Sequence, residues 1–219
     1  MSTFIVHTIP GSPAARAVMI ALVEKGAPFR VAGMAPGAHR AEPHLSRHPF
    51  GRMPVLEHDG FTLYETQAIL RYLDRILPEP ALTPREPREA GRMDQIMGIS
   101  DWYLFQGVSS IIGFYRVVGP RLMGLAPDET KIAEAMPRAH VVFAELSRLL
   151  GSKAYLACER MTLADVIVAP HMEFLAQTPE WTVLTRGRSN LVEWLDRMNE
   201  RDSLKSTGWD AVAELAKAG

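Results

Sequence analysis

Cysteine is almost absent from this sequence, since its 219 residues contain only Cys158. A single cysteine cannot form a disulfide within the chain, and it excludes a Cys-x-x-Cys redox pair. We therefore expect a protein of a reducing compartment such as the cytoplasm, in which Cys158 packs as a small apolar residue.

Long apolar runs and an excess of one charge are also missing. No stretch approaches the roughly 20 apolar residues that span a bilayer, and 24 Lys and Arg against 25 Asp and Glu leave a formal charge of −1. We expect neither a membrane nor a nucleic acid as partner. The opening residues MSTFIVHTIPGSP lack the basic and apolar regions of a secretory signal. The motifs of phosphate-binding loops, zinc proteases and hydrolase nucleophile elbows are absent too.

The most informative stretch is residues 50–73, FGRMPVLEHDGFTLYETQAILRYL. Residues 55–59 have the apolar, β-branched character of a strand, and Asp59-Gly60 is a tight-turn dipeptide. A second strand over 61–65 follows, and the apolar period then changes to that of a helix beginning at Thr66. The stretch therefore predicts strand, turn, strand and helix.

Both ends of this stretch suit a small anionic peptide. A cis Met53-Pro54 bond would leave the Met53 backbone free to pair with an extended ligand, as in strand addition. The helix that begins after Glu65 offers an N-terminus, which favours a carboxylate.

The residues before this stretch predict a strand, a helix and a parallel strand. Residues 4–9 form the first strand, and residues 29–34 the second. Ser12 and Pro13 are a preferred N-cap and first residue for the helix between them, and Gly26 ends it. With the later hairpin and helix, the order βαβ-ββα is that of a thioredoxin-like domain.

The residues after the stretch predict helices only. Prolines crowd residues 78–87, so we place a first domain at 1–78, a linker at 79–86 and a helical domain at 87–219. Helices are expected over about 86–117, over 128–150 with a kink or break at Pro137, from a capping box at Thr162, over 190–199, and in a polar tail.

These segments together resemble the cytosolic glutathione transferases, in particular bacterial, serine-type members with phi-, theta- and zeta-like features. The resemblance rests on MPVL at 53–56, ET at 65–66, AI and YL within the helix at 68–73, YLA at 155–157 and MTLADV at 161–166. It covers essentially the whole chain. It implies an α/β plus all-α fold, with an N-terminal thioredoxin-like domain followed by an all-helical C-terminal domain. It also implies glutathione as co-substrate without a metal, and a homodimer.

The resemblance assigns the thiol-activating hydroxyl to Ser12. Glutathione must be a thiolate to attack an electrophile, and a hydroxyl hydrogen bond at a helix N-terminus favours that anion. Serine-type relatives place their catalytic hydroxyl in a segment like PGSPAAR at 10–16. Thr8 is the backup hydroxyl. Without the resemblance, Ser12 would be interpreted as a helix cap alone.

The resemblance also implies the glutathione-binding residues. Met53 pairs its backbone with the cysteinyl unit after Pro54, and Glu65 and Thr66 hold the γ-glutamyl end. Arg52 lies where relatives have a Gln or Lys that contacts the peptide. A pair equivalent to His39 and Arg40 holds the glycyl carboxylate in the plant-type serine class.

Several alternatives remain open at this point. The enzyme could be a zeta-like glutathione-dependent isomerase, a peroxidase or a reductive dehalogenase, although the Ser-Ser-Cys run of zeta relatives is missing. It could also be a non-catalytic glutathione-binding stress protein. His44 and His48 are four residues apart, but no further ligand completes a zinc set, so we expect both in a solvated loop.

Overall fold

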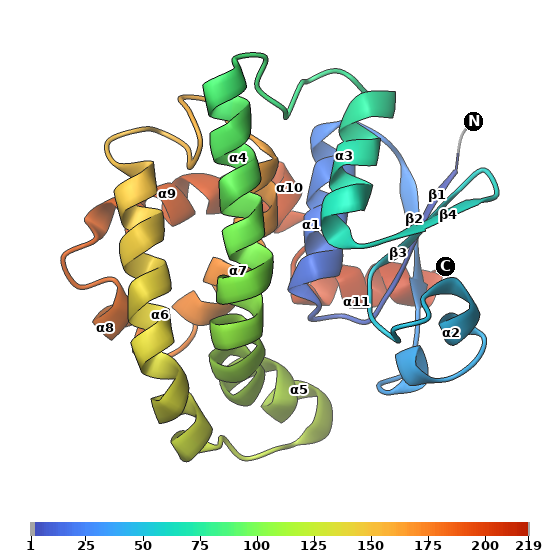
Figure 1. The fold of residues 1–219 in the computed structure, drawn as a ribbon. Coiled ribbons are helices and arrows are strands. Elements are labelled where there is room, and N and C mark those ends of the chain that lie inside the picture. The colour runs from blue at the N-terminus through green and yellow to red at the C-terminus, as the bar shows by residue number, and fades with distance from the viewer. Residues whose placement is uncertain (1–2, 219) are drawn as a thin grey trace. The chain divides into compact units, whose positions relative to one another are not determined.

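A computed structural model describes residues 3–218 of the chain. Its contacts divide the chain into two compact units. One comprises the chain up to Ala81 together with the segment from Glu200 onward, and the other is Leu82–Asn199. Figure 1 colours the chain from blue to red, so the first unit contains both the blue and the red segments.

The first unit is built on a four-stranded sheet of order β2-β1-β3-β4. The predicted order of elements is confirmed. Its elements are β1 (Phe4–Thr8), α1 (Pro13–Glu24), β2 (Phe29–Gly33), η1 (Ala38–Arg40), α2 (His44–Arg47), β3 (Val55–His58), β4 (Phe61–Tyr64), α3 (Thr66–Ile76), α10 (Asp202–Lys205) and α11 (Trp209–Ala218). β1 pairs in parallel with β2 and antiparallel with β3, and β3 and β4 form the hairpin.

Local sequence signals fix the corners of this unit. Ser12 caps α1 with Pro13 as its first residue, and Gly26 follows the helix at a φ of +63°. The hairpin turn has positive φ at both Asp59 and Gly60, which is the geometry that suits the twist of two antiparallel strands. The Met53-Pro54 peptide is cis.

The two faces of the sheet differ. Phe4, Val6 and Thr8 are fully or almost fully buried on one face of β1, whereas His7 lies on the other face and retains some exposure. Figure 1 shows α1 and α3 on one side of the sheet and α2 on the other. The strand period of two therefore separates an apolar core face from a polar face that meets α2.

The end of the chain groups with the first unit, which differs from the predicted boundary of 87–219. Arg201 forms an ion pair with Glu24 of α1 at 2.7 Å, and the Arg16 side chain donates to the Leu204 carbonyl at 2.9 Å. α10 packs on α1, and α11 packs on β2. The two side-chain contacts join residues 177 and 188 positions apart, which a local boundary signal such as proline cannot indicate.

The second unit is entirely helical over the part of the chain that the structure describes. It contains α4 (Pro87–Ile99), the π-helical segment η2 (Ser100–Val118), α5 (Gly119–Met123), α6 (Glu129–Leu150), α7 (Leu163–Ala176), α8 (Glu180–Leu184) and α9 (Ser189–Asn199). The predicted long helix is confirmed by α4 and η2, which run on without a break. α6 passes through Pro137 as one helix, so of the two expected outcomes, a kink or a break, the break does not occur.

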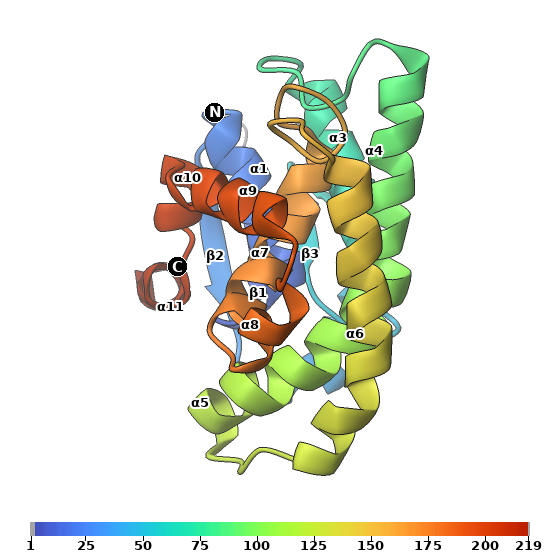
Figure 2. The same cartoon turned by 90° about the vertical axis from the view of Figure 1, so that its left-hand side faces the viewer.

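α7 is the core helix of this unit. Nearly all its residues are buried, and it packs against α4, η2, α8 and α9 (Figure 2). Its predicted capping box is present, because the Thr162 side chain accepts from the Asp165 backbone N–H and the Asp165 carboxylate accepts from the Thr162 N–H at 2.8 Å. A helix that is apolar on every side is stable only when neighbours surround it.

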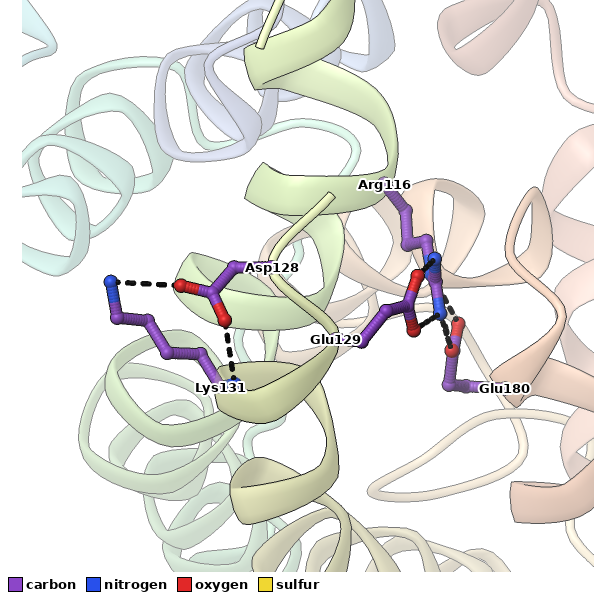
Figure 3. A network of polar contacts seen from close by, with 5 residues as sticks. All are labelled: Arg116, Asp128, Glu129, Lys131 and Glu180. Carbon is purple, nitrogen blue, oxygen red and sulfur yellow. Dashed lines mark hydrogen bonds and ion pairs between the residues drawn. The ribbon is translucent and has the colours of Figure 1, made fainter. Parts of the chain in front are cut away.

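A bidentate arginine joins three helices of the second unit (Figure 3). Arg116, near the end of η2, donates to Glu129 at the start of α6 and to Glu180 at the start of α8, each at 2.6 Å at the closest. Asp128 and Lys131 form a separate pair at 3.1 Å beside this network. The network ties the end of η2 to the N-termini of two neighbouring helices.

Candidate active site

Ser12 lies in the loop between β1 and α1, where its hydroxyl is half-buried. Its Oγ accepts a hydrogen bond from the Ala15 N–H at 3.3 Å, and its backbone carbonyl accepts from the Arg16 N–H at 2.9 Å. The cap uses only the acceptor capacity of the hydroxyl, so the O–H hydrogen can still be donated to a ligand. Capping and thiolate stabilisation are therefore compatible roles for one serine.

Thr8, the alternative hydroxyl, is placed differently. It is the last residue of β1 and is completely buried. Its hydroxyl donates to the Ile9 carbonyl at 3.0 Å and lies 3.8 Å from the Met53 sulfur. A buried hydroxyl whose hydrogen is already donated is poorly placed to receive a thiolate, so the geometry favours Ser12.

Met53 lies just outside the sheet. The pairing of β1 with β3 ends at Val55, two residues further on, so the Met53 backbone is beyond the ladder. Its half-buried side chain reaches the end of β1 through the contact with Thr8. Pro54 is buried, and β3 begins at the next residue. An extended peptide could thus pair with the chain at Met53.

Glu65 forms the corner between β4 and α3. It has a φ of +70°, which is uncommon for a residue with a side chain and costs about 1–3 kcal/mol. The Glu65 side chain is exposed and does not cap α3, which begins at Thr66. An uncapped helix N-terminus next to an exposed carboxylate suits a ligand that carries both a carboxylate and an ammonium group.

His39, Arg40 and Arg52 lie in one corner of the unit. A β-carbon on Gly51 would be 3.1 Å from the His39 carbonyl and 3.7 Å from the Arg40 Cα, so the two backbone segments touch. Gly51 itself has a φ of +57°. His39 is half-buried, and both arginines are exposed. The corner therefore presents two cations beside an imidazole.

His44 and His48 are buried, so the expectation of a solvated loop is wrong for both. His44 Nε2 lies 2.7 Å from the Arg52 carbonyl, and because a carbonyl only accepts, this nitrogen carries the proton. The His48 ring stacks on Tyr64 with centroids 4.5 Å apart. The spacing of four residues, followed by aromatic Phe50, was the available signal that α2 turns these rings inward.

The charges of this region act on one another. Burial lowers the pKa of His48, while the Glu65 carboxylate opposes this shift and the charges of His44 and Arg52 add to it. Burial, then Arg40 and His44, lowers the pKa of His39. Glu65 and Arg52 therefore lie near enough to His48, and Arg40 near enough to His39, to influence the pKa of each imidazole.

Residues 3–218 contain no group of three or more His, Cys, Asp or Glu side chains arranged to hold a metal ion. Within the same range, no helix is both long enough and apolar enough to span a membrane. Cys158 is buried as expected, and burial raises the pKa of its thiol.

The thioredoxin-like unit, with a capping serine after β1 and a cis-proline before β3, and the separate helical unit define the architecture of a glutathione transferase. The chain matches the family models for the glutathione S-transferase N-terminal domain over residues 2–75 and the C-terminal domain over residues 105–202. It therefore belongs to the glutathione S-transferase family.

Individual relatives agree with this assignment. The chain is 29% identical over 199 residues to glutathione S-transferase F7 of Arabidopsis thaliana, covering 90% of this chain and 94% of the relative. It is 31% identical over 169 residues to glutathione S-transferase hmp2 of Hypomyces subiculosus, covering 72% and 76%. The crystal structure of glutathione transferase F2 from Populus trichocarpa superposes with a TM-score of 0.81 at 26% identity and covers 99% and 100%.

Proposed function

We propose that this protein transfers glutathione to small, partly apolar electrophiles, and that Ser12 stabilises the glutathione thiolate. The observation that carries the proposal is the half-buried Ser12 hydroxyl at the N-terminus of α1, whose oxygen is held by the Ala15 N–H while its hydrogen remains to be donated. The names of the relatives and the match to both family domains support the same reaction.

The energy required of the site is modest. A free thiol has a pKa of roughly 8.5, and lowering it by about two units requires about 2.7 kcal/mol of preference for the anion. A hydrogen bond to a charged acceptor contributes about 1.5–3 kcal/mol, and a helix N-terminus about 0.3–1 kcal/mol. Ser12 at the start of α1 supplies both, so one residue position accounts for the activation.

We assign the glutathione-binding site, referred to below as the glutathione seat, to two groups of residues in the first unit. Met53, after the cis bond to Pro54, pairs with the cysteinyl backbone, and Glu65 and Thr66 hold the ammonium and carboxylate of the γ-glutamyl end. A second cluster binds the glycyl carboxylate and comprises His39, Arg40 and Arg52. His39 Nδ1 is a buried polar atom that no other described residue satisfies, and such an atom costs about 1–3 kcal/mol until a ligand pairs with it.

A titration of bound glutathione tests the role of Ser12. The ultraviolet absorbance of the thiolate is followed against pH for the unmodified protein and for Ser12→Ala. We expect the thiol to ionise well below its free pKa in the unmodified protein and near that value in the variant. If glutathione binds to both but its thiol titrates normally in both, the protein is a binding protein and the proposed chemistry fails.

A homodimer in the cytoplasm, with a role in detoxification, completes this proposal. Two neighbouring aromatic side chains of η2, Trp102 and Tyr103, are 67% and 55% exposed, and Phe50 of the first unit is 71% exposed. Large exposed aromatics of this kind are enriched at protein interfaces. The mass in solution checks this, and a monomer at micromolar concentration would contradict it.

A further inference from the structure

The indole of Trp209, the first residue of α11, lies directly against the loop that carries Ser12. A β-carbon on Gly11 would be 2.0 Å from Cζ3 of this ring and 2.4 Å from Cη2, which no side chain can approach. Gly11 also has a φ of +85°, so two independent constraints require glycine there. The ring therefore forms one wall of the loop immediately before Ser12.

A buried arginine connects the same loop to α10. Arg16 is one helical turn after Ser12, and its N–H donates to the Ser12 carbonyl at 2.9 Å. Its guanidinium donates to the Leu204 carbonyl at 2.9 Å and to the Thr207 hydroxyl at 3.4 Å. Burial lowers the pKa of Arg16 to about 10, so the group still carries its charge at neutral pH.

Contacts on both sides of Trp209 fix the segment on the first unit. Before it, Arg201 pairs with Glu24 at the far end of α1. After it, Ala216 packs on β2 so closely that a β-carbon on Gly33 would be 2.7 Å from its own. The segment that contains Trp209 is therefore attached to the first unit on both sides of the indole.

We propose that Trp209 is a positioning residue for the thiol-activating hydroxyl. It holds the backbone at Gly11, and so the Ser12 side chain, in the orientation that donates to sulfur. This inference rests on the proposed role of Ser12 and adds that the activating loop is completed by the end of the chain, not by the thioredoxin-like elements alone.

Substitution of Trp209 by Ala and by Phe tests this role, with Trp181→Ala as the matched control. Trp181 is also a half-buried tryptophan near a helix N-terminus, but it packs on Phe143 in the second unit. For each variant we would measure the apparent pKa of bound glutathione, kcat, the KM for glutathione, and the midpoint of thermal unfolding.

We expect Trp209→Ala to raise the thiol pKa towards that of Ser12→Ala and to lower kcat by about tenfold to a hundredfold, the cost of a misplaced catalytic group. The KM for glutathione changes little, because the peptide seat lies on other elements. Trp209→Phe retains a ring against Gly11 and most of the activity. Trp181→Ala leaves the thiol pKa unchanged, whatever it does to the unfolding midpoint.

The inference is overturned if Trp209→Ala lowers the unfolding midpoint but leaves the thiol pKa and kcat as in Trp181→Ala, because the ring would then be packing alone. Should Trp209→Ala not fold, Trp209→Leu replaces it with the same expected direction and the same refuting result. The failure is distinct from that of the proposed function: a normal thiol pKa in the unmodified protein refutes Ser12 itself.

Discussion

The Glu57 carboxylate connects the sheet to α2, which follows the segment that carries His39 and Arg40. Removal of the Glu57 charge therefore gives a specific prediction. Arg47, the last residue of α2, donates through Nε to Glu57 of β3 at 2.8 Å. The same Glu57 oxygen lies 3.1 Å from His7 Nε2 of β1. Glu57→Gln keeps the shape of the side chain but removes the charge that both partners face.

The size of the effect follows from exposure. The Arg47 and Glu57 side chains are 34% and 29% exposed, so solvent screens the pair and its contribution is at most about 1 kcal/mol. That energy corresponds to about a fivefold change in an equilibrium constant. We expect Glu57→Gln to raise the KM for glutathione by up to about fivefold and to leave kcat unchanged, since Ser12 is on another loop.

The pH of the assay does not limit this test. Burial acts to raise the pKa of Glu57, but the hydrogen bond from Arg47 and the neighbouring His7 outweigh it, so the pKa lies below its ordinary value. A carboxyl with a depressed pKa contributes its stability above the unfolded value and loses it as the pH falls through the folded one. At neutral pH Glu57 is therefore ionised, and the ion pair between Arg47 and Glu57 is fully formed.

Steady-state kinetics at varied glutathione concentration measures the effect, and Glu145→Gln is the control. Glu145 pairs with Arg148 at 2.7 Å on the surface of α6 in the second unit, whereas every residue assigned to the site belongs to the first unit. The reasoning is refuted if Glu57→Gln and Glu145→Gln change the KM equally, or if Glu57→Gln lowers kcat with an unchanged KM.

Two further predictions concern protonation and stability. The pKa of His39 is lowered chiefly by burial, and a carboxylate bound beside the imidazole would raise it. S-methylglutathione should therefore bind more tightly as the pH falls from about 8 to about 6. Calorimetry measures this pH dependence of binding, and His39→Gln should flatten it. A flat profile in the unmodified protein would exclude His39 from the seat. Asp165→Asn should cost about 3–5 kcal/mol in urea unfolding, because its carboxylate accepts from Thr162, Leu156 and Trp194 and an amide has only one accepting end. A loss below about 1 kcal/mol would show that these bonds rearrange.

Most of the fold could be predicted because its signals are local. The Asp59-Gly60 turn, the Ser12-Pro13 helix start and the Thr162 capping box each depend on residues within four positions of one another. Such patterns act through backbone geometry and through hydrogen bonds that the tertiary structure does not alter. The parallel pair and the hairpin followed from them, because a βαβ unit and a tight turn leave few other pairings of consecutive strands.

The remaining features depend on contacts that are distant in the sequence. The burial of His44 and His48 depends on Tyr64 and on the Arg52 carbonyl, neither of which the loop itself specifies. The polar composition of the segment after Glu200 did not indicate that this segment packs on α1 and β2 of the first unit. A weak signal exists in the apolar face of α11, where Trp209, Val212 and Ala216 are three and four residues apart, but this period predicts a buried face and not its partner.

The return of the chain's end to its beginning has a consequence for biosynthesis. The helical unit is continuous in sequence, so all of its residues are synthesised before Glu200. The thioredoxin-like unit is interrupted, and its α1 and the Gly11 loop lack the contacts of Arg201, Leu204 and Trp209 until residues 201–209 are translated. We therefore expect the unit that is synthesised first to complete its folding only after Trp209 has been added, and truncation before Arg201 to destabilise this N-terminal unit.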